Sequence, residues 1–231
     1  MTTERHEMTF PAESDEYREA RNRLLAAEIE LRRQEEAVAA QRRALPLGGE
    51  VTGDYVFDSP SGTVTLAELF ANGKDTLYLY NFMFIPGAHG QPLERACPSC
   101  TSIIDGMDGA FRHLLDRVDV AIVAKAPIGQ FADWGRERGW RFAPLYSSAA
   151  SAFNRDYNAE SDDAGQLPIA HVFTRADGRI HHRWSSELFA APTEPGQHPR
   201  HVDYMWPIWK VLDLTPAGRG ADWHPRYRYD T

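Results

Sequence analysis

Hydrophobic and small residues recur with the period of a helix near the start of the chain. Over most of residues 14–43 their positions alternate between steps of three and four: Tyr17, Ala20, Leu24, Ala27, Leu31 and Val38. Ser14 is a suitable N-cap, and Pro46 with the two glycines behind it would end the helix. The pattern therefore predicts one long helix over residues 14–43, with Glu28 and Arg32 spaced for an ion pair on its surface.

The apolar stripe of this helix has two interpretations. The repeat is short for a coiled coil, which favours a helix that packs across its own domain. The alternative is a contact between two copies of the chain, that is, a homodimer formed through the N-terminal helix.

Beyond residue 50 the pattern changes to short apolar runs separated by turn residues. The run at 76–84, TLYLYNFMF, is almost wholly apolar, which is typical of a central strand covered on both faces. We expect further strands at 55–57, 118–124, 140–146, 169–175 and 179–184, the last two joined as a hairpin by Asp177 and Gly178. Helices are expected at 65–70, 97–115, 128–138 and 208–214.

Alternating strands and helices followed by a hairpin predict an α/β fold with a mixed central sheet flanked by helices. We expect three parts along the chain. Residues 1–50 form a helical arm, residues 51–185 form the α/β domain, and residues 186–231 form an irregular extension packed on the same domain.

Composition excludes several classes of function. The chain has 231 residues and a net charge of −8, so it lacks the basic character of a nucleic-acid-binding protein. No apolar run is long enough to span a bilayer, and the N-terminal residues lack the pattern of a secretory signal. We therefore expect a cytoplasmic protein with no nucleic-acid or membrane partner.

The two cysteines of the chain, Cys97 and Cys100, lie in one CPSC motif at the expected start of a helix. Four explanations compete: a redox couple, half of a metal site, a peroxide-reducing thiol with its resolving partner, or chance. A thiol reacts as the thiolate, which the N–H groups and partial positive charge of a helix N-terminus stabilise. Pro98 suits the first helical position. This predicts an accessible, acidified Cys97 as the attacking residue and Cys100, one turn along, as the resolving residue.

A metal site is the weaker explanation. Zinc needs two ligands beyond one CxxC pair, and no histidine has ligand spacing to the motif. His181 and His182 are adjacent in a strand, so their side chains face opposite ways. We expect neither a metal nor an organic cofactor.

The order of elements around the motif is the thioredoxin layout: a strand, the CxxC, a helix, a strand, a helix, then a proline before a hairpin. Pro168 stands where that fold carries a cis-proline facing the disulfide. We therefore include Pro168 in the candidate site and expect its peptide bond to be cis.

The chain also resembles a bacterial thioredoxin-like family catalogued as domain of unknown function 899. The matching segments, in chain order, are RRALP, YVFDSPSGTVTLAELF, YNFMF, CPSC, DGMDGAFRHL, AKAP, GWRFAPLYSS, FNRDY and LDLTPAGRG. The resemblance implies a thioredoxin-like fold of peroxiredoxin type and a dithiol–disulfide oxidoreductase, with the site carried over at Cys97, Cys100 and Pro168. The chain departs from the family pattern at Lys125, where arginine is expected, and in a longer segment at 187–204.

Two other functions stay open. The middle of the chain also looks like a peroxiredoxin, but a peroxidatic cysteine normally follows a Pro-x-x-x-Thr-x-x-Cys frame. Gly90 and Glu94 occupy the proline and threonine positions here, and a carboxylate beside the thiol would raise its pKa. The other alternative is a non-catalytic thioredoxin-like module that binds a partner or senses redox state.

Lys125 and Trp134 are candidate substrate-binding residues. Lys125 follows a buried strand, at the sheet edge where such folds place ligands, and Trp134 lies on the apolar face of a predicted helix. A solvated lysine and a core tryptophan are the simpler interpretations. Asp105 and Asp108 are candidates to support proton transfer. The expected partners are a disulfide-containing protein or small thiol substrate, and a cellular thiol reductant.

Overall fold

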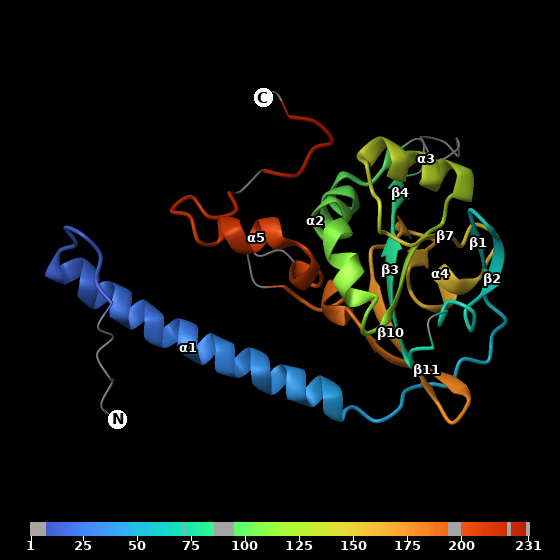
Figure 1. Ribbon diagram of the computed structural model, residues 1–231, viewed down its shortest axis with the longest axis horizontal. Helices are drawn as coiled ribbons and strands as arrows, with labels where there is room; N and C mark the ends of the chain where they lie inside the picture. The colour runs from blue at the N-terminus through green and yellow to red at the C-terminus, as the bar shows by residue number, and fades with distance from the viewer. Residues whose placement is uncertain (1–7, 72, 86–94, 194–199, 221–222, 230–231) are drawn as a thin grey trace. The chain divides into compact units, whose positions relative to one another are not determined.

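The computed structural model describes residues 8–71, 73–85, 95–193, 200–220 and 223–229 (Figure 1). The chain divides into two compact units, Met1–Pro46 and Leu47–Thr231. The second unit contains the sheet and the CPSC motif. In the described ranges, no helix combines the length and the apolar character that crossing a membrane requires.

The first unit is one helix, α1 (Asp15–Ala44), as the sequence predicts. The hydroxyl of Ser14 accepts a hydrogen bond from the backbone N–H of Tyr17, and none of the residues of α1 is buried. The predicted pair of Glu28 with Arg32 is wrong, because Arg21 pairs with Glu28. Arg32 pairs instead with Glu36, one turn toward the C-terminus. Both interpretations of the apolar stripe stay predictions.

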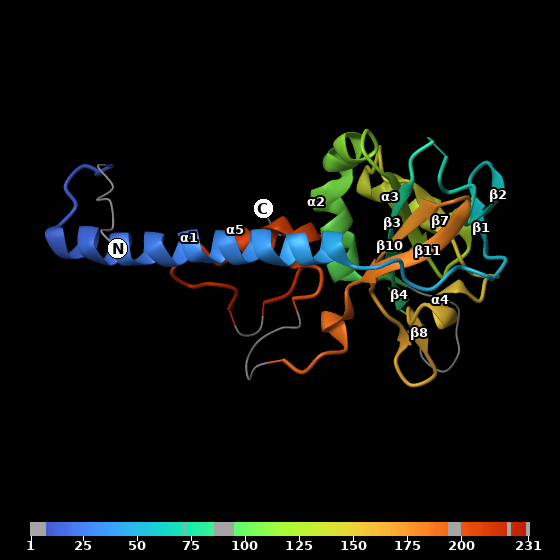
Figure 2. The ribbon, with the colours of Figure 1, turned by 90° about the horizontal axis from the view of Figure 1, so that it is seen from below.

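The second unit is built on a seven-stranded sheet with the order β11-β10-β3-β6-β7-β1-β2. Its strands are β1 (Val56–Ser59), β2 (Gly62–Thr65), β3 (Thr76–Phe82), β6 (Asp119–Ala124), β7 (Leu145–Ser147), β10 (Ala170–Ala176) and β11 (Arg179–Ser185). The β3–β6 and β6–β7 pairs are parallel, and the other neighbours are antiparallel. Figure 2 shows the predicted β10–β11 hairpin as two adjacent orange arrows.

Two shorter ladders stand outside this sheet: β4 (Phe84–Ile85) with β5 (Arg95–Ala96), and β8 (Glu160–Ser161) with β9 (Gly165–Gln166). The extension after β11 contains two 3-10 turns, η2 (Glu187–Phe189) and η3 (Asp203–Met205), and the helix α5 (Pro207–Leu212). Residues 194–199 of the long segment that departs from the family pattern lie outside the described residues.

The side chains of the central strands alternate between two apolar cores, one on each face of the sheet. Tyr80 and Phe82 of β3 join one core, with side chains of α2 (Pro98–Leu114) and α3 (Ile128–Arg138). Leu77 and Leu79 of the same strand join the other, with Phe153 of α4 (Phe153–Asp156). The period of two in strand geometry divides the run at 76–84 between these cores, which explains why it is apolar along nearly its whole length. The predicted mixed α/β sheet with flanking helices is confirmed.

Two predicted elements are wrong in part. Of the predicted helix at 65–70, residues 66–69 form a turn instead, and the carboxylate of Glu68 accepts hydrogen bonds from the N–H and the hydroxyl of Thr65. In the stretch at 140–146, only the end belongs to a strand, β7. The carboxylate of Asp108 binds the backbone N–H groups of residues 141–143 at 2.9 Å each, which holds that stretch as a loop.

Candidate active site

The CPSC motif lies at the start of α2, directly after the short strand β5. The backbone N–H of Cys97 donates to the carbonyl of Met83 at 2.9 Å, and Cys97 is the N-cap of α2 in an extended conformation. Pro98 occupies the first turn, where its missing N–H costs no helical hydrogen bond. The backbone N–H of Thr101 then donates to the carbonyl of Cys97 at 2.9 Å. The sequence prediction that α2 begins at this motif is confirmed.

Both cysteines are free thiols, and both are largely enclosed. Cys97 is 7% exposed and Cys100 is 1% exposed. The expectation of a freely accessible Cys97 is therefore met only in a small part of its surface. Cys100 has no direct route to a substrate, which fits a residue that reacts only with its neighbour.

The two sulfurs differ in acidity. A hydrogen bond from the thiol of Cys100 is the main reason that the pKa of Cys97 falls to about 6 from its ordinary value of 9.0. Backbone N–H groups of Cys100 and Ser99 and the hydroxyl of Ser99 assist, whereas burial opposes the shift. Burial raises the pKa of Cys100 well above its ordinary value. Cys97 therefore carries the thiolate at neutral pH, and Cys100 carries the proton.

Tyr80 is a member of this cluster that the sequence does not indicate. Its hydroxyl donates to Sγ of Cys100 at 3.3 Å, and its side chain is fully buried. This hydrogen bond lowers the pKa of Cys100, against the larger effect of burial. Tyr80 thus favours the anionic form of Cys100.

Pro168 lies at the head of β10, where the sequence places it, but its expected cis peptide bond is wrong. Among the described residues every peptide bond is trans. The carbonyl of Pro168 lies 3.0 Å from Nε2 of His201, which brings the C-terminal extension onto this turn. A role of Pro168 beside the sulfurs stays a prediction.

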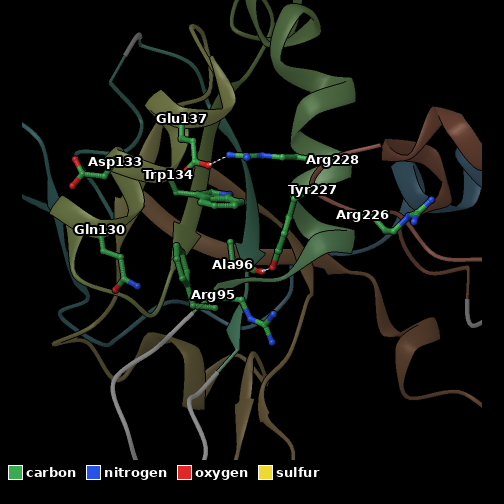
Figure 3. Close-up of a pocket in the computed structure, with 10 residues that line it drawn as sticks. Arg95, Ala96, Gln130, Asp133, Trp134, Glu137, Arg226, Tyr227 and Arg228 are labelled. Atoms are coloured by element: carbon green, nitrogen blue, oxygen red, sulfur yellow. Dashed lines mark hydrogen bonds and ion pairs between the residues drawn. The ribbon is translucent and has the colours of Figure 1, made fainter. Parts of the chain in front are cut away.

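A pocket of about 890 Å³ opens beside the motif (Figure 3). Its lining includes Ala96, which directly precedes Cys97, and the candidate Trp134 of α3. The indole N–H of Trp134 donates to the hydroxyl of Thr101 at 3.2 Å, so α3 is tied to the first turns of α2. Trp134 therefore lies both against the core and in the wall of a cavity next to the motif.

The other polar candidates lie elsewhere. Lys125 forms an ion pair with Glu160 and is not among the residues that line this pocket. Asp105 pairs with Arg138 and accepts the indole N–H of Trp140 at 2.8 Å. Asp108 holds the loop at 141–143, as described above. The two aspartates thus have structural partners that account for their positions, and our hypothesis of proton transfer is not supported for either.

The C-terminal tail supplies residues that the sequence does not assign to the site. The hydroxyl of Tyr227 donates to the carbonyl of Ala96, and the Tyr227 ring packs edge-on against Trp134 with centroids 5.2 Å apart. Arg138 donates to the backbone carbonyl of Tyr227 at 2.8 Å. Figure 3 shows Tyr227 reaching across to Ala96. The tail therefore forms one wall of the pocket.

No group of three histidine, cysteine, aspartate or glutamate side chains in the described part of the chain is arranged to hold a metal ion. His181 and His182 face opposite sides of β11, as predicted. Nδ1 of His181 lies 3.2 Å from the carbonyl of Gly48, whereas Nε2 of His182 lies 3.1 Å from Nδ1 of His171.

The fold and the motif together define a protein with a thioredoxin-like fold. The mixed sheet, the CxxC at the N-terminus of the helix after a central strand, and the closing hairpin are its features. A family model described as "Bacterial protein of unknown function (DUF899)" matches residues 7–230, and the chain belongs to this family. The resemblance of the sequence segments to this family is thus confirmed.

Comparison with curated proteins gave no match. Three of the similar solved structures illustrate the range. Peroxidoxin BcpB from Mycobacterium tuberculosis is 14% identical, with a TM-score of 0.45, and the match covers 73% of this chain and 98% of that one. A mutant of Peroxiredoxin Q from Xanthomonas campestris is 12% identical, with a TM-score of 0.47 and coverage of 71% and 96%. A putative thiol:disulfide interchange protein, DsbE, from Chlorobium tepidum is 13% identical, with a TM-score of 0.41 and coverage of 61% and 84%.

Proposed function

We propose that this protein is a dithiol–disulfide oxidoreductase in which Cys97 attacks and Cys100 resolves. The observation that carries the proposal is the difference between the two sulfurs. Cys97 has a pKa lowered to about 6 and retains some exposure, whereas Cys100 is buried, protonated and hydrogen-bonded to it. An exchange reaction needs this division between an anionic attacking thiol and a protonated resolving thiol.

The reaction would proceed in two exchanges. The Cys97 thiolate attacks one sulfur of a substrate disulfide, forms a mixed disulfide and releases the other half of the substrate as a thiolate. Cys100 then loses its proton and attacks Sγ of Cys97. This second exchange releases the remaining half as a thiolate and leaves an intramolecular Cys97–Cys100 disulfide. The substrate gains two electrons and the protein loses two.

Tyr80 would assist the second exchange, because its hydroxyl stabilises the Cys100 anion at the moment of attack. Pro168 would keep backbone groups near the sulfurs. The electrons would return from a cellular dithiol reductant in a reducing compartment such as the cytoplasm, which would restore both thiols by the same exchange chemistry.

A single-turnover experiment tests this proposal. The reduced protein is mixed with bis(2-hydroxyethyl) disulfide, quenched with acid, and analysed by mass for bound and released thiol. We expect the wild type to release two thiols per disulfide consumed and to end as the intramolecular disulfide. Cys100→Ser should accumulate the mixed disulfide on Cys97, and Cys97→Ser should react little.

Three outcomes would contradict the proposal. Equal reaction by the wild type and Cys97→Ser would show that Cys97 is not the attacking thiol. A wild type that consumes hydrogen peroxide rapidly but exchanges no disulfide would support the thiol peroxidase. A wild type with neither reaction would support the non-catalytic module that binds a partner or senses redox state.

A further inference from the structure

The pocket beside the CPSC motif is lined by both charged and aromatic side chains. Its lining is Phe84, Arg95, Ala96, Gln130, Asp133, Trp134, Glu137, Arg226, Tyr227 and Arg228. Three of these side chains carry a positive charge and two carry a negative charge. The lining is thus net positive on a chain whose net charge is −8.

The charged groups surround an aromatic centre. Figure 3 shows Trp134 and Tyr227 in the middle of the view, with Arg228 on one side of them and Arg95 on the other. The two rings are fixed by the hydrogen bonds of Trp134 to Thr101 and of Tyr227 to Ala96. This is the pattern of a ligand site, with rigid apolar walls and a few charged groups at its margin.

Two of the arginines are available to a ligand. In the described ranges Arg95 has no ion pair, and it lies in β5, the strand that leads directly into Cys97. Arg228 pairs with Glu137 at 3.5 Å, but their side chains are 88% and 56% exposed. An ion pair so open to water contributes little and can exchange its carboxylate for that of a ligand.

The surroundings of Cys97 restrict the size of what can react there. Cys97 is 7% exposed, and the hydroxyl of Tyr227 anchors the tail to the carbonyl of Ala96, the residue before Cys97. A disulfide in a folded protein would have to enter past this segment. A small molecule bound in the pocket of about 890 Å³ would lie against Ala96, the residue directly before Cys97, although Cys97 itself is not among the lining residues.

We infer that the substrate of this site is a low-molecular-weight disulfide whose halves carry carboxylates, held by Arg95 and Arg228, with Trp134 and Tyr227 as walls. This inference rests on the proposed function and adds its substrate class. The exchange itself is the one described above, with the substrate halves leaving as two thiols.

The test compares three small disulfides in single turnover with the reduced, full-length protein. Oxidised glutathione carries carboxylates and amines, cystamine carries amines alone, and bis(2-hydroxyethyl) disulfide is neutral. We expect Arg95→Ala to slow the reaction with oxidised glutathione by about five- to tenfold relative to its effect on the neutral disulfide, because a charge-assisted contact is lost. The reaction with cystamine should not slow.

Arg117→Ala is the matched control, because Arg117 is an exposed arginine beyond the far end of α2. It should leave all three rates within about twofold of the wild type, since it lies far outside the pocket. Arg228→Ala repeats the comparison independently of Arg95, which keeps the test valid if Arg95→Ala disturbs the motif.

The outcomes separate this inference from the proposed function. If the wild type exchanges with the neutral disulfide but both arginine variants change all three rates alike, the substrate class is wrong and the oxidoreductase stands. Preferred reaction with a protein disulfide such as insulin would also overturn the inference. If the wild type exchanges with none of the disulfides, the proposed function itself fails.

Discussion

Cys97 and Cys100 are both cysteines, but their different positions at the start of α2 give them different acidity and exposure. Cys97, at the N-cap, faces N–H groups and a thiol donor, whereas Cys100, one turn further, is enclosed by apolar side chains. Pro98 and the strand before the motif make the position of Cys97 predictable from sequence. The Tyr80 hydroxyl is not predictable, because a tyrosine within an apolar strand looks like core, and nothing local indicates that it meets a sulfur 20 positions away.

The acidity of Cys97 gives a prediction about pH. Its pKa is lowered to about 6, so the reactive thiolate predominates above pH 6 and is lost as the pH falls below it. Alkylation of the wild type by iodoacetamide should therefore reach half of its maximal rate near pH 6 and change little above pH 7. Cys100→Ala removes the main hydrogen-bond donor and should move this midpoint to higher pH. The rate is measured by mass on samples quenched with acid.

A midpoint near the ordinary pKa of 9.0 in the wild type would contradict the assigned acidity. An unchanged midpoint in Cys100→Ala would show that the thiol of Cys100 is not its main cause. Cys97→Ser serves as the control, because any label that it takes up reports on other sites.

At the scale of elements, the sequence indicates which segments are regular but not how each is tied down. The helix at 128–138 is found with its predicted bounds, since its apolar period and its glycine end are both local. The stretch at 140–146 looks like a strand because it is aromatic and apolar. Its first residues are drawn into a loop by Asp108, a carboxylate on α2 more than 30 positions earlier. Local patterns do not contain that contact.

Asp108→Ala should destabilise the protein by about 2 kcal/mol, because three backbone N–H groups lose a charged acceptor. The free energy of unfolding is obtained from urea denaturation. Asp116→Ala is the matched control, since Asp116 is an exposed carboxylate in the turn after α2, and its effect should stay within about 0.5 kcal/mol. Equal stability of both variants would contradict the role assigned to Asp108.

At the scale of the whole molecule, the C-terminal tail of the second unit packs beside the CPSC motif of the same unit. Tyr227 reaches the carbonyl of Ala96 across 131 positions, and Arg219 pairs with both Asp203 and Asp213 to order the segment that leads there. An irregular, aromatic tail has no period from which a docking site can be derived. The sequence therefore predicts an extension packed on the domain but not that its end forms a wall beside the motif.

Tyr227→Ala should open the approach to Cys97. We expect alkylation by a bulky polyethylene-glycol maleimide to accelerate by about fivefold, while alkylation by small iodoacetamide changes by less than about twofold, because only the large reagent needs the tail displaced. Tyr229→Ala is the comparison, as Tyr229 belongs to the same tail but does not line the pocket. Equal acceleration by both reagents, or by both variants, would contradict a specific covering role of Tyr227.

The most direct test of the account is a redox titration of the two thiols against defined ratios of reduced to oxidised dithiothreitol. The fraction of disulfide is read by mass after free thiols are blocked. We expect one reversible transition of two electrons between the dithiol and the Cys97–Cys100 disulfide, absent when either cysteine is replaced by serine. A chain that forms no such disulfide at any ratio would contradict it.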